Sequence, residues 1–436
     1  MKSKMIGRTE IIKTKYLIIG NSASGIGAAE AIRDVDKDGA LTIVSDEAYP
    51  AYSRPLISEL LANERTTDRI LFRQPDFYVQ NNINLLLNRK VTRLDLKQNI
   101  AHSENGEQIG WEKLLLATGG KPIIPEIKNS KKTGVFTFLT LKDAREISNF
   151  IKSGQQAVVM GGGLIGISAT EALTKRGVGV TIVEMKDRVL NTILDNEASL
   201  IVEETLRQSR IKLVTNHTVS SIVGDSTVES IILDNGEKIP CDLVVIAIGV
   251  LPRTELAFNT KIKVNRGIIV DRYMATAYPS VYACGDVAEA YDFIYETNRV
   301  ISIWPNAYIG GRVAGYNMAG IKTENTGYTA MNSLNYFGLD IATAGMITNA
   351  NNPDYEIISN HNNGNYKKLL LKNDYITGMA FIRDIEKAGM IFSLMRDHIN
   401  VRSLKHELLT NNFGLVCLPR QIWQERLGTP TKSISK

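Results

Sequence analysis

The sequence has few of the features that mark a secreted, membrane-bound or metal-dependent protein. Its three cysteines, Cys241, Cys284 and Cys417, lie far apart and show no Cys-x-x-Cys spacing, so neither a disulfide framework nor a zinc site is predicted. No apolar run approaches the roughly 18 residues of a membrane span, and residues 1–16 lack the apolar core of a secretory signal. We therefore predict a cytoplasmic protein with no membrane span and no bound metal.

A strong excess of charge is also missing. The net charge of +5 is spread over the chain without a block of five or six basic residues, so nucleic-acid binding is not predicted. A hydrophobic content of 44% is typical of a globular protein. At roughly 150 residues per domain, the length of 436 residues predicts about three domains.

The chain does contain a repeated strand–turn–helix pattern. The stretch LIIGNSASGIG at residues 18–28 joins a short apolar run to a helical pattern, and VVMGGGLIGIS at residues 158–168 does the same. Each leads to a further apolar run, ALTIVSD or GVTIVE, as in a βαβ unit. The later stretches LLLATGGKP (114–122) and VVIAIGVLP (244–252) extend the duplication. Two dinucleotide-binding domains are therefore predicted.

The second turn has the full glycine pattern of a phosphate-binding site. Gly161 allows the tight turn, Gly163 lets the backbone approach a pyrophosphate, and Gly166 lets the helix pack on the strand. The helix is expected to begin near Leu164 and Ile165, so that its N-terminus faces the phosphate charge.

Glu184 follows at the end of the next predicted strand. A carboxylate at this point can accept a hydrogen bond from a ribose 2′-hydroxyl and would repel a 2′-phosphate. NADH is therefore favoured over NADPH. Because Lys186 and Arg188 lie nearby in the sequence and either could turn toward a phosphate, NADPH stays the less favoured alternative.

The first turn keeps only two of the three glycines. Gly20 and Gly25 remain, and Ser22 takes the middle position, where its small side chain still admits a phosphate and its hydroxyl can donate to one. Ala23 follows at the expected start of the helix.

The acidic position of the first unit is displaced. Ser45 stands where Glu184 stands in the other copy, and Asp46 and Glu47 come directly after it. One of these two carboxylates is predicted to hold the adenosine ribose, and the sequence leaves open which.

The expected domains follow from the duplication. Residues 1–121 and 253–328 are predicted to form one discontinuous dinucleotide-binding domain, into which a second, residues 122–252, is inserted. Residues 329–436 alternate like antiparallel strands and then turn helical, which predicts a C-terminal α+β domain. We interpret this domain as the interface that docks a partner protein.

Local signals place several elements. Thr140 and Asp143 have the spacing of a capping box and predict a helix start. Asn373-Asp374 predicts a hairpin turn. Residues 304–320 are expected to be helical, and residues 428–436 are expected to form a loose tail.

Together these motifs resemble the two-dinucleotide-domain flavoproteins of the pyridine nucleotide-disulfide oxidoreductase superfamily. The resemblance covers residues 15 to about 325 and rests on GNSASG, YSRPLIS, LLATGGKP, GGGLIG with Glu184, AIGVLPR and VYACGDVAE, in that order. It implies an α/β fold with two Rossmann-like domains, for FAD and NAD, plus the C-terminal α+β domain.

The resemblance also implies site residues. The first site would bind FAD, with Arg54 near its phosphates, Thr118 and Gly119 beside the dinucleotide, and Asp286 accepting a hydrogen bond from the ribityl chain. The second site would bind NADH. The remaining implied cofactor residues are Gly249 in AIGVLPR, Gly285 in VYACGDVAE, and Trp304, Asn306 and Ala307, near the isoalloxazine ring.

Within the superfamily the chain is most similar to the branch without a redox cysteine, which includes rubredoxin reductase-like enzymes and the flavin portion of assimilatory nitrite reductase. Disulfide reductases carry one or two cysteines in the first domain, whereas no cysteine precedes Cys241 here. Thiol–disulfide chemistry at the flavin is therefore not expected, because no thiolate is available to attack.

The resemblance does not supply a proton-handling pair. Relatives often have Lys after RPxLS and Glu two residues past the third glycine, but the matching positions here are Glu59 and Ser168. Glu59 is interpreted as a surface residue rather than an acid/base. Glu171, one helical turn from Ser168, is the alternative, although a solvated face is the ordinary place for it. No catalytic residue is assigned.

The favoured function is an FAD-dependent NADH oxidoreductase that passes electrons to a carrier protein such as a rubredoxin, a ferredoxin or another iron-sulfur subunit. One alternative is an NADH oxidase that reduces oxygen directly. Another is a flavin-bearing structural or regulatory subunit of a larger redox complex. A homodimer is compatible with all three.

Overall fold

The computed structural model describes residues 11–347, 352–362, 364–410, 412–414 and 417. They form two compact units: one runs up to Met185 and includes Asn216–Thr329, and the other combines Lys186–Thr215 with the chain from Ala330 onward. The three-domain boundaries stay predictions, and the tail at residues 428–436 lies outside the described residues.

The first unit contains a mostly parallel sheet. Its strands, in spatial order, are β3 (Ile83–Leu86), β2 (Leu41–Val44), β1 (Ile11–Ile19), β6 (Gln108–Leu116), β5 (Ile100–Ser103) and β4 (Val91–Asp95), and β18 (Val281–Ala283) pairs with β6. The central strand β1 ends in a continuous buried run, as expected for a strand covered on both faces. The predicted strand–turn–helix is confirmed here, because β1 leads through residues 20–22 into α1 (Ala23–Val35).

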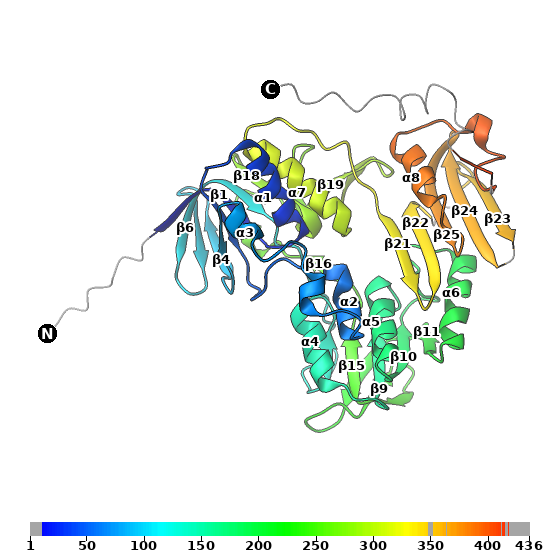
Figure 1. Ribbon diagram of the computed structural model, residues 1–436. Coiled ribbons are helices and arrows are strands. Elements are labelled where there is room, and N and C mark those ends of the chain that lie inside the picture. The colour runs from blue at the N-terminus through cyan, green and yellow to red at the C-terminus, as the bar shows by residue number, and fades with distance from the viewer. Residues whose placement is uncertain (1–10, 348–351, 363, 411, 415–416, 418–436) are drawn as a thin grey trace. The chain divides into compact units, whose positions relative to one another are not determined.

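Two helices pack side by side against this sheet, α1 and α7 (Trp304–Met318) (Figure 1). Their backbones approach closely where α7 has glycines. A Cβ on Gly311 would lie only 2.1 Å from the carbonyl oxygen of Ser24, and a Cβ on Gly315 would lie only 2.4 Å from the carbonyl oxygen of Ala28. A segment of chain predicted to be helical from residue 304 therefore completes the first nucleotide-binding fold.

A second parallel sheet in this unit repeats the arrangement. Its strands, in order, are β10 (Gly179–Glu184), β9 (Gln156–Met160), β15 (Leu243–Ile246) and β8 (Val135–Thr137). The turn after β9 leads into α5 (Leu164–Lys175). Helix α4 (Leu141–Phe150) starts at the predicted capping box, in which the Thr140 hydroxyl accepts a hydrogen bond from the Asp143 amide.

Smaller elements complete the first unit. A two-stranded ribbon, β7 (Gly120–Pro122) with β16 (Val250–Pro252), joins the two parallel sheets along the chain. The remaining elements are strands β12 (Val219–Val223), β13 (Ser230–Leu233), β14 (Lys238–Pro240), β17 (Ile268–Ile269), β19 (Ala288–Asp292) and β20 (Thr297–Val300), helices α2 (Ile57–Leu61) and α3 (Phe77–Gln80), and 3-10 turns η1 (Arg54–Leu56), η2 (Thr67–Ile70), η3 (Glu255–Ala257) and η4 (Gly285–Val287).

The second unit is built on an antiparallel sheet. Its strands, in order, are β21 (Met331–Tyr336), β22 (Leu339–Gly345), β25 (Tyr375–Ile382), β24 (Asn365–Lys372) and β23 (Glu356–Asn362). The unit also contains α6 (Asn196–Gln208), β11 (Lys212–Thr215), α8 (Ala388–Arg396) and η5 (Arg402–Leu404). The hairpin predicted at Asn373-Asp374 is confirmed, with both residues at positive φ (51° and 67°), as a type I′ turn requires.

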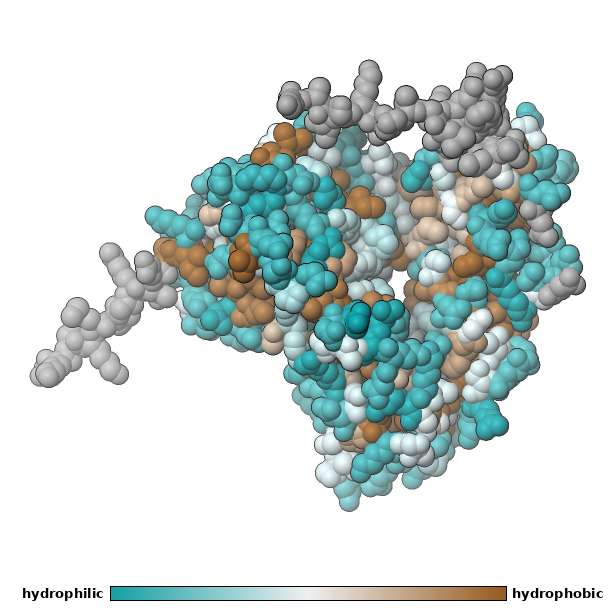
Figure 2. All heavy atoms as spheres, viewed as in Figure 1, coloured by the Kyte–Doolittle hydropathy of each residue, from teal (hydrophilic) through white to brown (hydrophobic). Residues whose placement is uncertain are grey.

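The visible surface mixes residue types. Figure 2 shows hydrophilic residues over much of this face with hydrophobic residues among them. Among the described residues, none of the helices combines the length and the apolar character that crossing a membrane would take.

Candidate functional site

The first glycine turn is shaped by close backbone contacts. Gly20 has φ +124°, and a Cβ there would lie 2.0 Å from the carbonyl oxygen of Ala117. A Cβ on Gly25 would lie 2.0 Å from the carbonyl oxygen of Gly20. Ser22 caps α1 through its backbone while its hydroxyl makes no capping hydrogen bond, and Ala23 is the first helical residue. The turn therefore keeps the amide groups at the start of α1 available for an anion.

The second turn repeats the geometry position by position. Gly161 has φ +105°, and its Cβ would meet the carbonyl oxygen of Ala247 at 2.5 Å. A Cβ on Gly166 would lie 1.9 Å from the carbonyl oxygen of Gly161. Around Gly163, by contrast, a Cβ would meet nothing within 4 Å. The middle glycine thus borders open space at the start of α5, where Leu164 and Ile165 begin the helix.

Glu184 lies at the C-terminal end of β10, next to this turn. Its Oε2 accepts a hydrogen bond of 2.6 Å from the backbone amide of Gly162, and the side chain is buried. A buried carboxylate fixed beside the turn is suited to accept from a ribose hydroxyl and disfavours a phosphate there.

The carboxylates of the first unit have partners inside the protein. The two Glu47 oxygens accept from the Arg54 guanidinium and from the Tyr52 hydroxyl, the latter at 2.7 Å. One Asp46 oxygen accepts from Arg253 at 2.8 Å. Either Asp46 or Glu47 is still the predicted ribose partner of the first site. Each carboxylate already accepts hydrogen bonds within the protein, so it would have to bind the ribose in addition to those partners.

Arg54 and Asp286 belong to one electrostatic environment. Burial raises the pKa of the Asp286 carboxyl above its ordinary value, and this effect is opposed by the Arg54 charge and by a hydrogen bond from Ser302. Gly285, just before it, has φ +75°, and a Cβ there would lie 2.2 Å from the Ser24 hydroxyl oxygen on α1. The two predicted FAD residues 285 and 286 are thus held against the helix that follows the first turn.

Three more predicted residues, Thr118, Gly119 and Gly249, directly precede the two strands of the ribbon. The Thr118 hydroxyl donates to the carbonyl of Arg253 at 2.8 Å, and the Gly119 carbonyl accepts from the Arg253 amide at 2.9 Å. Gly249 has φ +128°, and its carbonyl accepts from the Ile123 amide at 3.0 Å. A Cβ on Gly119 would meet nothing within 4 Å, so this glycine also borders open space.

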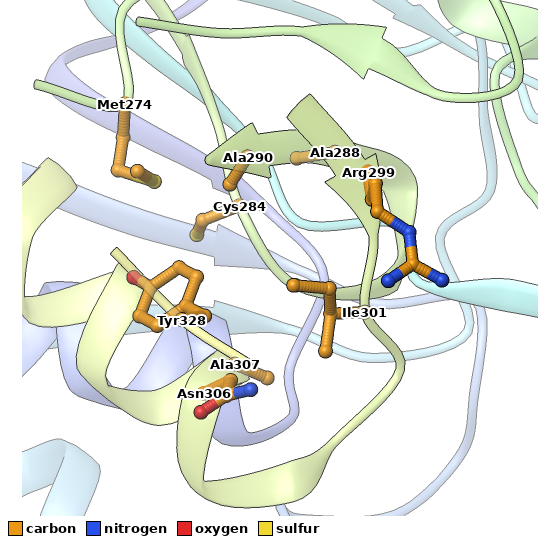
Figure 3. Close-up of a pocket in the computed structure, with 10 residues that line it drawn as sticks. Met274, Cys284, Ala288, Ala290, Arg299, Ile301, Asn306, Ala307 and Tyr328 are labelled. Atoms are coloured by element: carbon orange, nitrogen blue, oxygen red, sulfur yellow. The ribbon is translucent and has the colours of Figure 1, made fainter. Parts of the chain in front are cut away.

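Gly285, Asn306 and Ala307 line one small cavity of about 10 Å³ (Figure 3). That volume holds a single water-sized molecule, so the cavity lies beside the predicted flavin residues and is too small to be the flavin site itself. The other lining residues are Met274, Cys284, Ala288, Ala290, Arg299, Ile301 and Tyr328. Asn306 is fixed by a 3.0 Å hydrogen bond from its amide to the carbonyl of Thr329.

Trp304, the first residue of α7, lies in an aromatic cluster. Its ring centroid is 5.2 Å from that of Phe72, with an interplanar angle of 84°. Phe72 also lies 5.9 Å from the Tyr308 ring, at 87°. These edge-to-face contacts fix the indole at the helix start.

The buried thiols are poor nucleophiles. Burial raises the pKa of Cys284 and of Cys241 to about 12 in each case. The third thiol, Cys417, is half-buried. Glu59 pairs with Arg65, and Glu171 pairs with Lys175 at 3.3 Å.

Sequence reasoning missed several residues that shape this site. Tyr52 and Arg253 stand at the start of YSRPLIS and at the end of AIGVLPR, but the motifs alone do not show which residues they contact. Phe72 and Tyr328 lie outside the quoted motifs, and their contacts join distant parts of the chain. For the close contact of α1 with α7, the four-residue spacing of Gly311 and Gly315 was an available signal.

Two observations test whether the residues fit FAD and NAD. Both turns exclude any side chain at their first and third glycines, and at Gly119 and Gly163 a Cβ would project into open space. The buried carboxylate of Glu184 lies beside the second turn, and the Arg54 guanidinium pairs with Glu47 after the second strand of the first sheet. This set of donors and acceptors fits two dinucleotides.

The comparisons with known proteins agree. Residues 14–311 match the family described as pyridine nucleotide-disulphide oxidoreductase, and residues 331–399 match the C-terminal domain of rubredoxin NAD+ reductase. The chain is 30% identical over 402 residues to subunit epsilon of the NADH-dependent phenylglyoxylate dehydrogenase of Aromatoleum evansii, covering 91% of this chain and 95% of that one.

Two further relatives are informative. Identity to the nitrite reductase [NAD(P)H] of Bacillus subtilis is 30% over 391 residues, 89% of this chain and 48% of that protein, so the chain spans about half of its length. The crystal structure of the NADH:rubredoxin oxidoreductase of Clostridium acetobutylicum has a TM-score of 0.76 at 27% identity, covering 92% of this chain and 100% of that chain.

The predicted fold class and the predicted cofactors, FAD and NADH, are thereby confirmed. The two matched regions account for the duplicated turns of the first unit and for the antiparallel sheet of the second. The chain therefore belongs to the pyridine nucleotide-disulphide oxidoreductase family, as an FAD-dependent NAD(P)H oxidoreductase.

Proposed function

We propose that this chain oxidises NADH and passes the electrons singly to a protein carrier of the iron-sulfur or rubredoxin type. The observation that carries the proposal is the combination of two dinucleotide-binding turns with a C-terminal segment, residues 331–399, that matches the C-terminal domain of rubredoxin NAD+ reductase. FAD, when bound, supplies the ability to accept a hydride and to release electrons one at a time.

The residues of the chain would bind and orient the two nucleotides. Amides at the start of α1 and α5 would hold the phosphates, and Arg54 would add positive charge at the first site. Asp286 would accept a hydrogen bond from the ribityl chain. The glycine openings at residues 119 and 163 support close approach of both ligands.

The choice of NADH over NADPH rests on Glu184. Its carboxylate is buried and tied to the amide of Gly162, so a 2′-phosphate would bring a second negative charge against a group that water screens poorly. The ribose 2′-hydroxyl of NADH would instead donate to it.

The choice of a protein acceptor rests on what the flavin side of the site contains. No cysteine precedes Cys241 in the sequence, and burial raises the pKa of the Cys284 thiol to about 12. These observations do not support a mechanism in which a cysteine thiolate accepts the electrons from the flavin. The net charge of +5 supports association with an acidic carrier.

The test is reduction of purified rubredoxin, and separately of a [2Fe–2S] ferredoxin, by NADH and the full-length chain under anaerobic conditions. Ferricyanide serves as a small acceptor that needs no docking surface. We expect reduction of at least one protein at a rate comparable with ferricyanide, falling as salt is raised. Reduction of ferricyanide alone, or rapid oxygen consumption without any carrier, would contradict the proposed acceptor.

A second candidate has support from one relative, which is a subunit of a larger NADH-dependent dehydrogenase. In that case the acceptor or donor is an iron-sulfur subunit of the same complex rather than a free carrier. The chain would then react with NADH and ferricyanide but with neither free carrier protein. We further propose that the protein works in the cytoplasm, as a homodimer or as such a subunit, which sedimentation of the native protein distinguishes by mass.

A further inference from the structure

A network of charged and aromatic side chains lies behind Trp304. The Phe72 ring meets both Trp304 and Tyr308 edge-to-face, at centroid distances of 5.2 and 5.9 Å. Trp304 and Tyr308 are one helical turn apart on α7, and Phe72 packs against both rings. The orientation of the indole therefore depends on where Phe72 is held.

A cation also contacts the Phe72 ring. The Arg73 guanidinium lies 4.2 Å from the Phe72 ring centroid, and its Nε donates a 2.5 Å hydrogen bond to Oε1 of Glu30. That hydrogen bond raises the pKa of Arg73 above its ordinary value. The charge over the ring is thus fixed by Glu30 rather than free to move in solvent.

Glu30 also fixes the other end of the cluster. Its Oε2 accepts a 2.7 Å hydrogen bond from the Tyr308 hydroxyl, and its side chain is 18% exposed, so the interactions are only partly screened. Glu30 lies on α1, the helix that follows the first glycine turn. One carboxylate thus links α1, α7 and the segment around Phe72.

The same segment touches the predicted phosphate region. The Phe72 amide donates to the carbonyl of Ala51 at 2.8 Å, and the Ala51 amide donates to the Tyr78 hydroxyl, which in turn donates to Asn21 in the first turn. A displacement of Phe72 would therefore change the contacts of Trp304 and the hydrogen bonds next to the first glycine turn.

We propose that Glu30 and Arg73 are positioning residues that hold Phe72 against Trp304 and so fix the flavin end of the first site. This inference rests on the proposed function, because Trp304 has a role in the reaction only if the first site holds FAD. Neither Glu30 nor Arg73 takes part in the chemistry. Their effect is on the alignment of the two nucleotides, where a misplacement of about 1 Å costs roughly 100-fold in rate.

The test compares Glu30→Gln, Arg73→Met and the double variant with the control Asp34→Asn. Asp34 links the same two helices through Arg312 and Tyr316 and, within the described part of the chain, contacts neither Phe72 nor Arg73, although Arg312 also lies 3.9 Å from Glu30. The control therefore tests whether a neighbouring ion pair between the helices is enough to produce the effect. The first readout is acrylamide quenching of Trp304 emission in the FAD-free protein, with Trp304→Phe as the blank. The second is the rate of flavin bleaching by NADH in single turnover.

We expect each network variant to raise the quenching constant about twofold and to slow bleaching about tenfold or more, with the double variant no worse than the poorer single one. Asp34→Asn should change neither. Unchanged quenching or unchanged bleaching in both single variants, or equal effects in Asp34→Asn, would overturn the proposal. Phe72→Leu keeps the test open if Arg73→Met fails to fold.

Failure of this proposal and of the proposed function are distinguishable. If wild-type protein with bound FAD is not bleached by NADH, the proposed function fails, while the quenching readout in FAD-free protein still reports whether Glu30 and Arg73 fix Trp304. If bleaching occurs at the same rate in all variants, the function stands and the positioning role is wrong.

Discussion

The backbone amide of Gly162 donates a 2.6 Å hydrogen bond to the buried carboxylate of Glu184. This bond joins the turn that would receive the pyrophosphate of NADH to the side chain that would receive its ribose. A substitution at Glu184 should therefore disturb the geometry of the turn as well as the contact with the ribose.

Glu184→Ala should weaken NADH binding and reduce discrimination against NADPH. A hydrogen bond to a charged group is worth about 1.5–3 kcal/mol, so KM for NADH should rise roughly 10- to 100-fold. The affinity for NADPH should fall less, because the variant no longer carries the Glu184 carboxylate that repels the 2′-phosphate. Steady-state kinetics with both nucleotides measure this. The exposed Glu112→Gln is the control, and an unchanged ratio of kcat/KM values would contradict the assignment.

Two glycines of the second turn should behave oppositely when replaced by alanine. At Gly166 a Cβ would lie 1.9 Å from a carbonyl oxygen, so Gly166→Ala should destabilise the fold. At Gly163 nothing lies within 4 Å and φ is −82°, so Gly163→Ala should fold normally yet bind NADH poorly. Thermal unfolding and NADH titration separate the two effects. Normal NADH affinity in Gly163→Ala would show that the turn does not approach a ligand.

The stability of FAD-free protein should depend on Asp286. Burial raises the pKa of this carboxyl in the folded state, so the folded protein binds the proton more tightly than the unfolded chain does. The contribution of Asp286 to stability should then be largest below its unfolded-state pKa and be lost as pH rises through the raised pKa.

Asp286→Asn removes the unfavourable free energy of holding a charged carboxylate in this buried position. FAD-free Asp286→Asn should have a higher Tm than FAD-free wild type at pH 7, and the difference should shrink toward pH 4. The exposed Glu324→Gln is the control. A gain that does not change with pH, or a loss at pH 7, would contradict the raised pKa. FAD should dissociate faster from the variant, since the charged acceptor is lost.

Asp195 should be important for the second unit. Its Oδ1 caps α6 by accepting from the Ala198 amide, and its Oδ2 accepts from Tyr366 and, at 2.6 Å, from Lys368 on β24. Loss of a cap costs about 1 kcal/mol, and leaving a buried charge unpaired costs roughly 3–5 kcal/mol. The Lys368 side chain is only 11% exposed, so the loss of Asp195 would leave its ammonium group largely buried without this partner.

Asp195→Ala should therefore speed amide hydrogen exchange in α6 and β24 strongly. Asp195→Asn, which can still cap the helix, should have a smaller effect. Exchange followed by mass spectrometry localises the change. Equal protection in wild type and Asp195→Ala would mean that this carboxylate does not hold α6 to β24. The same network is a reason not to test docking by deleting residues 329–436, because the deletion would strip Asp195 of both partners.

The sequence was sufficient to predict the features that depend on local rules. The glycine turns, the capping box at Thr140 and the hairpin at Asn373 each have a short motif with one favoured geometry. The complete glycine pattern of the second turn supported the assignment of the first, in which Ser22 replaces the middle glycine.

The remaining features depend on contacts between distant segments. No local rule joins Glu47 to Arg54 and Tyr52, or Phe72 to Trp304, because each pair meets only after the sheet has formed. Likewise, residues 186–215 group with the C-terminal sheet through Asp195, Tyr366 and Lys368. A sequence pattern carries no signal for such a long-range ion pair.

The most direct measurement is an anaerobic titration of the purified protein with NADH, and in parallel with NADPH, followed through the flavin absorption bands. We predict bleaching at close to one equivalent of NADH and a much weaker response to NADPH. A bound flavin that neither nucleotide bleaches would contradict the proposed hydride transfer from NADH.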